Sequence, residues 1–129
     1  MMNMRLLLAL GGVVLINAQA EAMYCGYKDY LHLSDQSHPG IYIVSGFAEP
    51  DLNMQIVGPR SFVLRDTELC TSGYAHVTVA YDAVNYCVLD IKDGPWMMNP
   101  AITASCSGIR YLGTSYDGLG SYSYTINLD

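Results

Sequence analysis

Residues 74–91 read YAHVTVAYDAVNYCVLDI, and this stretch carries the clearest structural signal in the chain. Its first half alternates two sets of side chains, Ala75, Val77, Val79 and Tyr81 against His76, Thr78 and Ala80. Its second half alternates in the same way through Cys87, Leu89 and Ile91. A period of two is that of a β-strand, whose successive side chains point to opposite faces. Asp82 and Asn85 favour a turn between the two runs, so the stretch predicts a β-hairpin.

Similar short runs recur along the chain after residue 22, and none of them has the period of a helix. The further predicted strands are GIYIVSGF at 40–47, MQIVG at 54–58, SFVLRD at 61–66, SGIRYLG at 107–113 and SYSYTINL at 121–128. With the hairpin they make about seven strands joined by short connections, which favours antiparallel pairing. The sequence therefore predicts an all-β domain, built as a small antiparallel β-sandwich or barrel, and it does not distinguish between the two.

The first 22 residues, MMNMRLLLALGGVVLINAQAEA, have the features of a secretory signal peptide. Arg5 precedes an uninterrupted apolar run over residues 6–16. A membrane-spanning helix needs about 20 apolar residues, so this run is too short to remain as an anchor. Ala20-Glu21-Ala22 matches the pattern of a cleavage site, and we expect cleavage before Met23. Cleavage two residues earlier is the alternative.

Residues 23–129 are expected to form a single secreted domain, because a chain of this size holds one hydrophobic core. Its destination is the periplasm or the extracellular space, and the sequence does not separate these two. No stable membrane insertion is expected once the signal peptide has been removed.

Four cysteines, Cys25, Cys70, Cys87 and Cys106, follow the predicted signal peptide. Their even number and the oxidising destination predict two disulfides, each stabilising the fold by about 3 kcal/mol. Three pairings are open, and we favour Cys25 with Cys70 and Cys87 with Cys106 because each pair closes a modest loop. Zinc is the rival interpretation, but the cysteines lack the close spacing of a zinc knuckle, so no metal is expected.

Acidic residues outnumber basic ones by twelve to six, which gives a net charge of −6. A negative chain without a basic cluster repels phosphate backbones and anionic headgroups, so nucleic-acid binding is not expected. The chain also lacks a glycine-rich phosphate loop that opens a helix, so no cofactor is expected.

Catalytic signatures are missing from the sequence. His32, His38 and His76 are the histidines available as general bases, but no G-x-S-x-G motif accompanies them. His76 alternates with Thr78 on the polar side of a predicted strand, which is typical of a solvent-facing residue. The sequence therefore predicts no catalytic residue.

Glycoside hydrolysis needs two carboxyl groups, and two pairs of acidic residues could supply them, Glu49 with Asp51 and Asp90 with Asp93. Both pairs stand beside proline or glycine at the ends of predicted strands, where acidic residues commonly form turns. Asp93-Gly94 and Asp117-Gly118 are also typical of calcium loops, but neither follows the spacing of an EF-hand.

Tyrosine is unusually frequent, with eleven in the chain, and it provides a large contact area at small entropic cost. Tyr122 and Tyr124 continue an alternating apolar row and are expected in the core. Tyr116 stands in GTSYDGLG, which is expected to be a loop without a packing partner. The predicted binding residues are Trp96, Tyr111, Tyr116 and Asp117.

These features together predict a secreted, non-enzymatic binding protein that acts on another protein through an aromatic, acidic surface. Inhibitors, immunity proteins and effectors are of this physical type. One alternative is a carbohydrate-binding module or toxin-type lectin subunit, in which Trp96 and the loop tyrosines would stack on sugar rings. The other alternative is a small secreted hydrolase.

Overall fold

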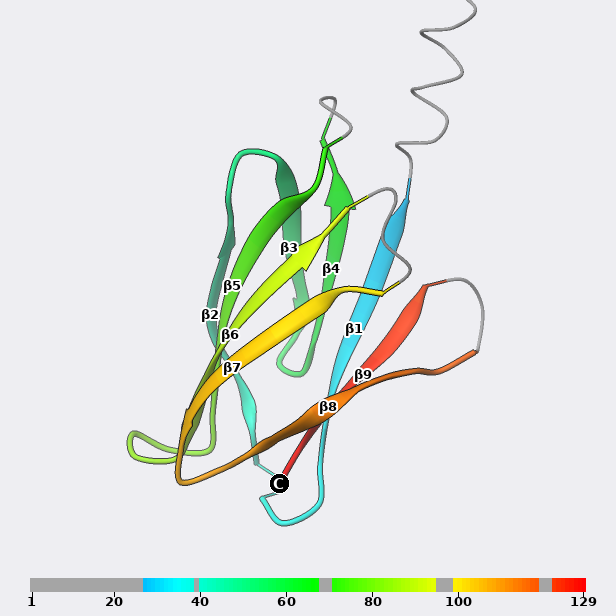
Figure 1. Cartoon of the computed structure of the whole chain (residues 1–129). Coiled ribbons are helices and arrows are strands. Elements are labelled where there is room, and N and C mark those ends of the chain that lie inside the picture. The colour runs from blue at the N-terminus through cyan, green and yellow to red at the C-terminus, as the bar shows by residue number, and fades with distance from the viewer. Residues whose placement is uncertain (1–26, 39, 68–70, 95–98, 119–121) are drawn as a thin grey trace, which may run out of the picture.

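The computed structural model describes residues 27–38, 40–67, 71–94, 99–118 and 122–129. These residues form nine β-strands and no helix, which confirms the predicted all-β class (Figure 1). The strands are β1 (Lys28–Asp35), β2 (Tyr42–Ala48), β3 (Leu52–Gly58), β4 (Ser61–Asp66), β5 (Gly73–Ala80), β6 (Tyr86–Asp93), β7 (Ala101–Ser107), β8 (Tyr111–Tyr116) and β9 (Ser123–Leu128). The predicted signal peptide at 1–22 lies outside the described residues.

The strands form two sheets that pack face to face as a β-sandwich (Figure 1). The five-stranded sheet has the order β3-β4-β1-β9-β8, and the four-stranded sheet has the order β2-β5-β6-β7. The buried side chains of both inner faces make one continuous core. Its largest members are Phe62, Leu31, Ile41, Leu64, Leu89, Ile91, Ile126 and Leu128.

One strand pair departs from the predicted antiparallel arrangement. β1 and β9 run parallel, with Leu31 beside Tyr124 and Leu33 beside Ile126. The remaining pairs are antiparallel. Short connections favour antiparallel neighbours, but β1 and β9 are the first and last strands, and the whole intervening domain connects them.

Two strands, β1 and β7, were missing from the sequence prediction. In β1 the inward-facing row reads Asp29, Leu31 and Leu33, so an acidic residue interrupts the apolar pattern. In β7 the sequence AITASCS consists mostly of small side chains that stay exposed, and the apolar alternation is therefore weak. Pairing with neighbouring strands stabilises both β1 and β7, and neither strand has a strong local sequence signal.

The predicted hairpin is present as β5 and β6, in continuous antiparallel register from Gly73 opposite Asp93 to Ala80 opposite Tyr86. Asp82 sets the turn, because its carboxylate accepts the backbone N–H groups of Val84 and Asn85 at 2.9 Å. The turn lets the hairpin carry its apolar row into the core and its polar row to solvent.

A disulfide joins Cys87 of β6 to Cys106 of β7, as the favoured pairing predicts. The two residues lie directly opposite each other in neighbouring strands, with their Cα atoms 4.0 Å apart. The Cys87 side chain is fully buried, so the bond anchors β7 to the core. Cys25 and Cys70 lie outside the described residues.

The burial and position of the tyrosines near the C-terminus differ in part from the prediction. Tyr124 is 2% exposed and belongs to the core, as expected, but Tyr122 is half exposed and adopts a left-handed φ of 67°. Tyr116 does not stand in a loop without a packing partner. It is the last residue of β8, opposite Tyr124, and the centroids of the two rings are 5.6 Å apart.

We expect Tyr124→Ala to lower the free energy of unfolding by about 3–5 kcal/mol, because it removes a buried aromatic ring from the core. Tyr116→Ala should cost about 1 kcal/mol or less, since 57% of that residue is exposed. Denaturant unfolding of the two variants beside the natural chain measures both values. Equal losses would contradict the assigned core position of Tyr124.

Candidate functional site

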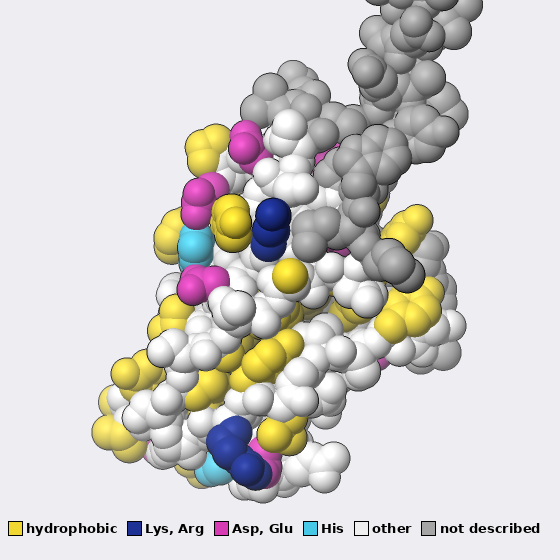
Figure 2. Space-filling model, viewed as in Figure 1, with side chains coloured by type: hydrophobic (Ala, Val, Ile, Leu, Met, Phe, Trp, Pro, Cys, Tyr) yellow, Lys and Arg dark blue, Asp and Glu magenta, His cyan; other side chains and the backbone are white. Residues whose placement is uncertain are grey.

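The outer face of the four-stranded sheet exposes several large apolar side chains. The register of its strands places them on the side opposite the core. We call this surface the aromatic face, and its members are Tyr42, Phe47, Tyr74, Tyr86 and Val88, each between 36% and 63% exposed. In Figure 2 hydrophobic side chains gather along the left of the molecule, around a histidine with acidic neighbours.

A polar cluster of Glu49, His76 and Asp90 lies within the aromatic face. His76 Nε2 is 2.7 Å from a Glu49 oxygen, and His76 Nδ1 is 2.7 Å from an Asp90 oxygen. The ring of Phe47 packs beside the imidazole, with the ring centroids 4.9 Å apart. Phe47, His76 and Asp90 occupy directly opposite positions on β2, β5 and β6, so the sheet register builds the cluster.

The protonation state of His76 follows from these neighbours. Hydrogen bonds to Asp90 and to Glu49 raise the pKa of His76 above its usual value. A protonated imidazole donates from both ring nitrogens, and each nitrogen faces one carboxylate. Neither nitrogen is left to accept a proton from a substrate, so His76 is arranged as a bound cation rather than as a general base.

The surface is slightly hollow beside this cluster. A depression of about 410 Å³ is lined by Glu49, Tyr74, His76, Asp90 and Thr103. The ammonium group of Lys92 lies 5.9 Å from the centre of the Tyr74 ring, within the range of a cation–π interaction. The depression therefore combines the ring of Tyr74 with the imidazole of His76 and two carboxylates.

The sequence prediction missed this cluster and regarded His76 as an ordinary solvent-facing residue. Its members are far apart in sequence. The sequence pattern instead pairs Glu49 with Asp51, and Asp90 with Asp93, as acids for glycoside hydrolysis. A usable signal was nevertheless present in the predicted hairpin, because a turn at 82–85 places His76 opposite Asp90. Glu49 becomes a neighbour only through the pairing of β2 with β5.

Three of the four residues predicted for binding, Tyr111, Tyr116 and Asp117, lie on the other sheet, at β8 and just after it. Tyr111 is partly buried, and its hydroxyl shares a hydrogen bond of 2.6 Å with Thr114. Asp117 accepts hydrogen bonds from the hydroxyls of Ser123 and Thr125 at 3.0 and 2.6 Å. Tyr116 is the most exposed of the set at 57%. Trp96 lies outside the described residues.

The other two histidines, His32 and His38, contact serine hydroxyls and a tyrosine ring respectively. His32 Nδ1 is 2.9 Å from the Ser61 hydroxyl, and its Nε2 is 3.5 Å from the hydroxyl of Ser123. The ring of His38 packs edge-on against Tyr81. His32 thus has serine neighbours on both sides, but Asp117 bonds to Ser123 and not to the imidazole, which differs from the order of a catalytic triad.

The acidic pair of Asp90 and Asp93 does not come together in the fold. Asp90 points to solvent, whereas Asp93 faces the core and is 1% exposed, so the two carboxyls lie on opposite sides of β6. Asp93 instead forms a buried pair with Asp29 of β1, which is 5% exposed. Two neighbouring carboxyl groups in the interior disfavour the ionisation of both at once.

Burial, followed by the neighbouring Asp29, raises the pKa of Asp93 far above its ordinary value. Burial also raises the pKa of Asp29. Asp93 Oδ1 accepts the backbone N–H of Gly94 at 2.9 Å, while its buried Oδ2 has no donor among the described residues. This buried environment beside Asp29 suits a neutral Asp93 carboxyl group.

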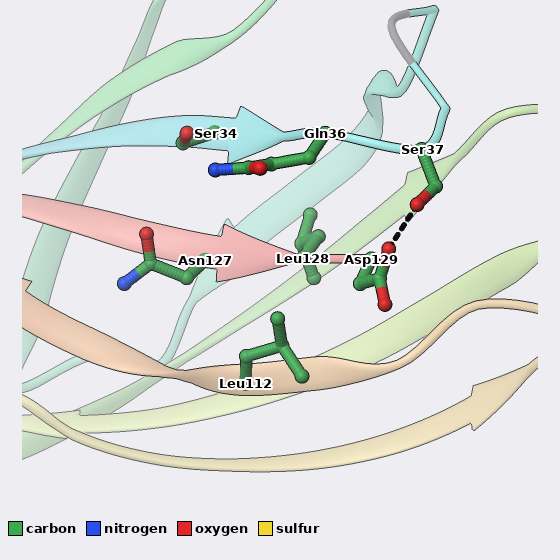
Figure 3. Close-up of a pocket in the computed structure, with 7 residues that line it drawn as sticks. All are labelled: Ser34, Gln36, Ser37, Leu112, Asn127, Leu128 and Asp129. Carbon is green, nitrogen blue, oxygen red and sulfur yellow. Dashed lines mark hydrogen bonds between the residues drawn. The ribbon is translucent and has the colours of Figure 1, made fainter.

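A second depression lies at the end of β9, and Figure 3 shows the residues around it. Its volume is about 470 Å³, and its walls are Ser34, Gln36, Ser37, Leu112, Asn127, Leu128 and Asp129. Ser37 donates a hydrogen bond to Asp129, which closes one side. The walls offer hydroxyl, amide and carboxylate groups beside two leucines, a chemistry that suits small polar molecules.

Comparison with protein-family models, curated proteins and solved structures finds no significant match. Within the described ranges, no group of three or more histidine, cysteine or acidic residues is arranged to hold a metal ion. The same residues include no helix long and apolar enough to cross a membrane.

The buried carboxyl pair predicts a dependence of stability on pH. In the unfolded chain aspartate releases its proton near pH 4, whereas folded Asp93 retains it well above that pH. The folded state therefore binds more protons, and stability falls as pH rises. The raised pKa of His76 acts in the same direction once pH exceeds about 6.5.

We expect the melting temperature to fall between pH 5 and pH 8 by at least about 4 °C, the shift that 1 kcal/mol produces in a domain of this size. Asp93→Asn keeps a donor for Asp29 without a titrating proton, so its curve should be flatter and higher at pH 8. Thermal unfolding monitored by circular dichroism measures both. Parallel curves for the two proteins would show that Asp93 does not titrate as inferred.

Proposed function

We propose that this chain is an exported, non-enzymatic protein that binds another protein through the aromatic face. The observation that carries the proposal is the exposure of Phe47, Tyr74 and Tyr86 together on one sheet face. Grouped apolar side chains of this kind mark interaction sites more often than ordinary surface. Aromatic residues are also enriched in protein interfaces, where they supply contact area with little loss of entropy.

The polar cluster at the centre of this face supports recognition rather than catalysis. Both nitrogens of His76 are engaged by carboxylates, and the exposed acids Glu49 and Asp90 remain available to a cationic group. A protonated His76 offsets one of the two carboxylate charges, so the cluster keeps a net negative charge. A partner with aromatic or aliphatic contacts around a lysine or arginine fits this surface by charge and by polarity.

We accordingly propose that the chain acts as inhibitors, immunity proteins and effectors do, by occupying another protein. The arrangement of the described histidines does not favour a hydrolase, since none of them joins a hydroxyl to a carboxylate in a cleft. The depression at the end of β9 favours small polar ligands by its lining, and carbohydrate binding there is the second candidate function.

Affinity capture with a substituted face tests the proposal. Phe47→Asp places a charge on the aromatic face beside His76, and we expect at least tenfold weaker retention of the partner, because aromatic residues dominate such interfaces. Ile56→Asp on β3 is the matched control, since Ile56 is also exposed but belongs to the five-stranded sheet. The control should retain the partner.

A third variant separates this surface from the residues predicted by sequence. Loss of the partner with Tyr116→Ala, combined with full retention by Phe47→Asp, would place the binding surface at β8 and reject the aromatic face. Equal loss with all three variants would indicate a general effect on folding. Circular dichroism of each variant excludes that outcome before capture is attempted.

We also propose that the chain is exported after cleavage before Met23 and carries a second disulfide between Cys25 and Cys70. The observed Cys87–Cys106 disulfide fits an oxidising compartment. β1 and β4 are antiparallel, with Lys28 opposite Arg65, so the chain before β1 and the chain after β4 leave the sheet at the same end. This register favours pairing of the two remaining cysteines.

Mass spectrometry of the exported protein under non-reducing conditions tests both parts. We expect the intact mass of a chain that begins at Met23, lower by four hydrogen atoms than that of the reduced chain, with Cys25 and Cys70 recovered in one cross-linked peptide pair. Recovery of either cysteine as a free thiol would reject the second disulfide.

A further inference from the structure

The sandwich has four edge strands, β2 and β7 in one sheet and β3 and β8 in the other. An exposed edge offers unpaired backbone groups to other chains, and proteins commonly block it with charges, prolines or bulges. Three of the four edges carry a break in register. These breaks lie between Ile43 and Ser45 in β2, between Ile56 and Gly58 in β3, and between Tyr111 and Gly113 in β8.

β7 is the exception among these edges. It pairs with β6 in unbroken register over its whole length, from Ala101 opposite Lys92 to Ser107 opposite Tyr86. Its sequence, AITASCS, contains no charged residue and no proline. The disulfide at Cys106 holds one end of the strand in place. Within the described part of the chain, β7 is therefore a regular edge without charges, prolines or a bulge.

The register identifies which backbone groups of β7 point outward. Antiparallel neighbours alternate between hydrogen-bonded pairs and closer pairs that do not exchange bonds, and a Cα separation of 4.0 Å assigns Cys87 and Cys106 to the closer kind. The bond from Tyr81 N–H to the Asn85 carbonyl gives the same alternation along β6. The N–H and C=O groups of Ile102, Ala104 and Cys106 consequently point away from β6.

Two side chains of β7 on the core side of the sheet are also exposed to solvent. Ala104 and Cys106 belong to the row of β7 that is continuous with the buried residues Leu89 and Cys87 of β6, yet both are exposed. Among the described residues no strand lies beyond β7. Another strand added at this edge would satisfy the backbone groups and cover these two side chains at once.

We propose that β7 pairs antiparallel with β7 of a second copy of this chain, about a twofold axis at Ala104. The outward-pointing groups then meet in three hydrogen-bonded pairs, Ala104 with Ala104 and Ile102 with Cys106 in both directions. Thr103 lies opposite Ser105 of the second copy, a pair of hydroxyl side chains that is favourable across strands. The two four-stranded sheets become one continuous sheet.

Charge favours a second copy as the occupant of this edge. Two chains that each carry a net charge of −6 repel over most of their surfaces, and β7 offers an uncharged seam. The nearest carboxylates on the same face are those of Asp90 in each copy, three strand spacings or about 14 Å apart. This exceeds the screening length of about 8 Å at physiological salt, so their repulsion is weak.

The proposal does not depend on the proposed function, and the oligomeric state of the disulfide-intact protein tests it. Light scattering after size exclusion, over about 5 µM to about 500 µM protein, covers the range of weak homodimers. We expect the mass to rise twofold with concentration. A mass that stays monomeric throughout this range overturns the proposal.

Ala104→Pro removes one outward N–H and leaves the bonds between β7 and β6 intact, because those involve the odd-numbered residues of β7. We expect this variant to remain monomeric with an unchanged circular dichroism spectrum. Ala104→Lys provides a second test without backbone change, since it places two like charges opposite each other at the axis. Leu112→Lys, on the bulged edge β8, is the matched control and should dimerise normally.

Hydrogen exchange locates the interface independently of the variants. On dimerisation the amides of Ile102, Ala104 and Cys106 should become protected, whereas those of Thr103 and Ser105 should be protected in monomer and dimer alike. A dimer whose even-numbered β7 amides exchange freely, or one that persists in both Ala104 variants, overturns the proposal by placing the interface elsewhere.

Discussion

The parallel pairing of β1 with β9 is the interaction on which the rest of the structure depends. β1 is the central strand of the five-stranded sheet, with β4 on one side and β9 on the other. Without this pairing the sheet divides into a three-stranded part and a separate hairpin of β8 and β9. Because the two strands begin and end the described domain, their pairing closes the longest loop in the fold. The final sheet therefore forms only when the last strand is present.

Features that are encoded locally could be predicted from the sequence, whereas features that depend on pairing between distant strands could not. Residues 74–91 show a strict alternation, and they form the predicted hairpin. β1 was missed because Asp29 occupies a position where an apolar residue would be expected, and β7 because alanine and serine give little contrast between the two faces. The parallel order of β1 and β9 has no local signature. Tyr116 was misplaced because GTSYDGLG resembles a loop more than a strand.

The Glu49–His76–Asp90 cluster illustrates the same limit at the site. Each residue alone is an ordinary polar residue of a strand or turn, and only two separate registers bring the three together. The buried pair of Asp29 and Asp93 is also set by packing between the sheets. The buried pair places carboxyl groups where they cost stability at neutral pH, which contrasts with the apolar consistency of the remaining core.

The bulges in β2, β3 and β8 limit how far a sheet of this protein can extend. A molecule with two regular edges can add copies at both, and such head-to-tail association leads to open filaments. Here the regular edge is confined to β7, and a strand that joins it leaves only interrupted edges exposed. Growth would therefore terminate after a single addition. The irregular edge strands therefore disfavour the growth of this β-rich chain into fibres.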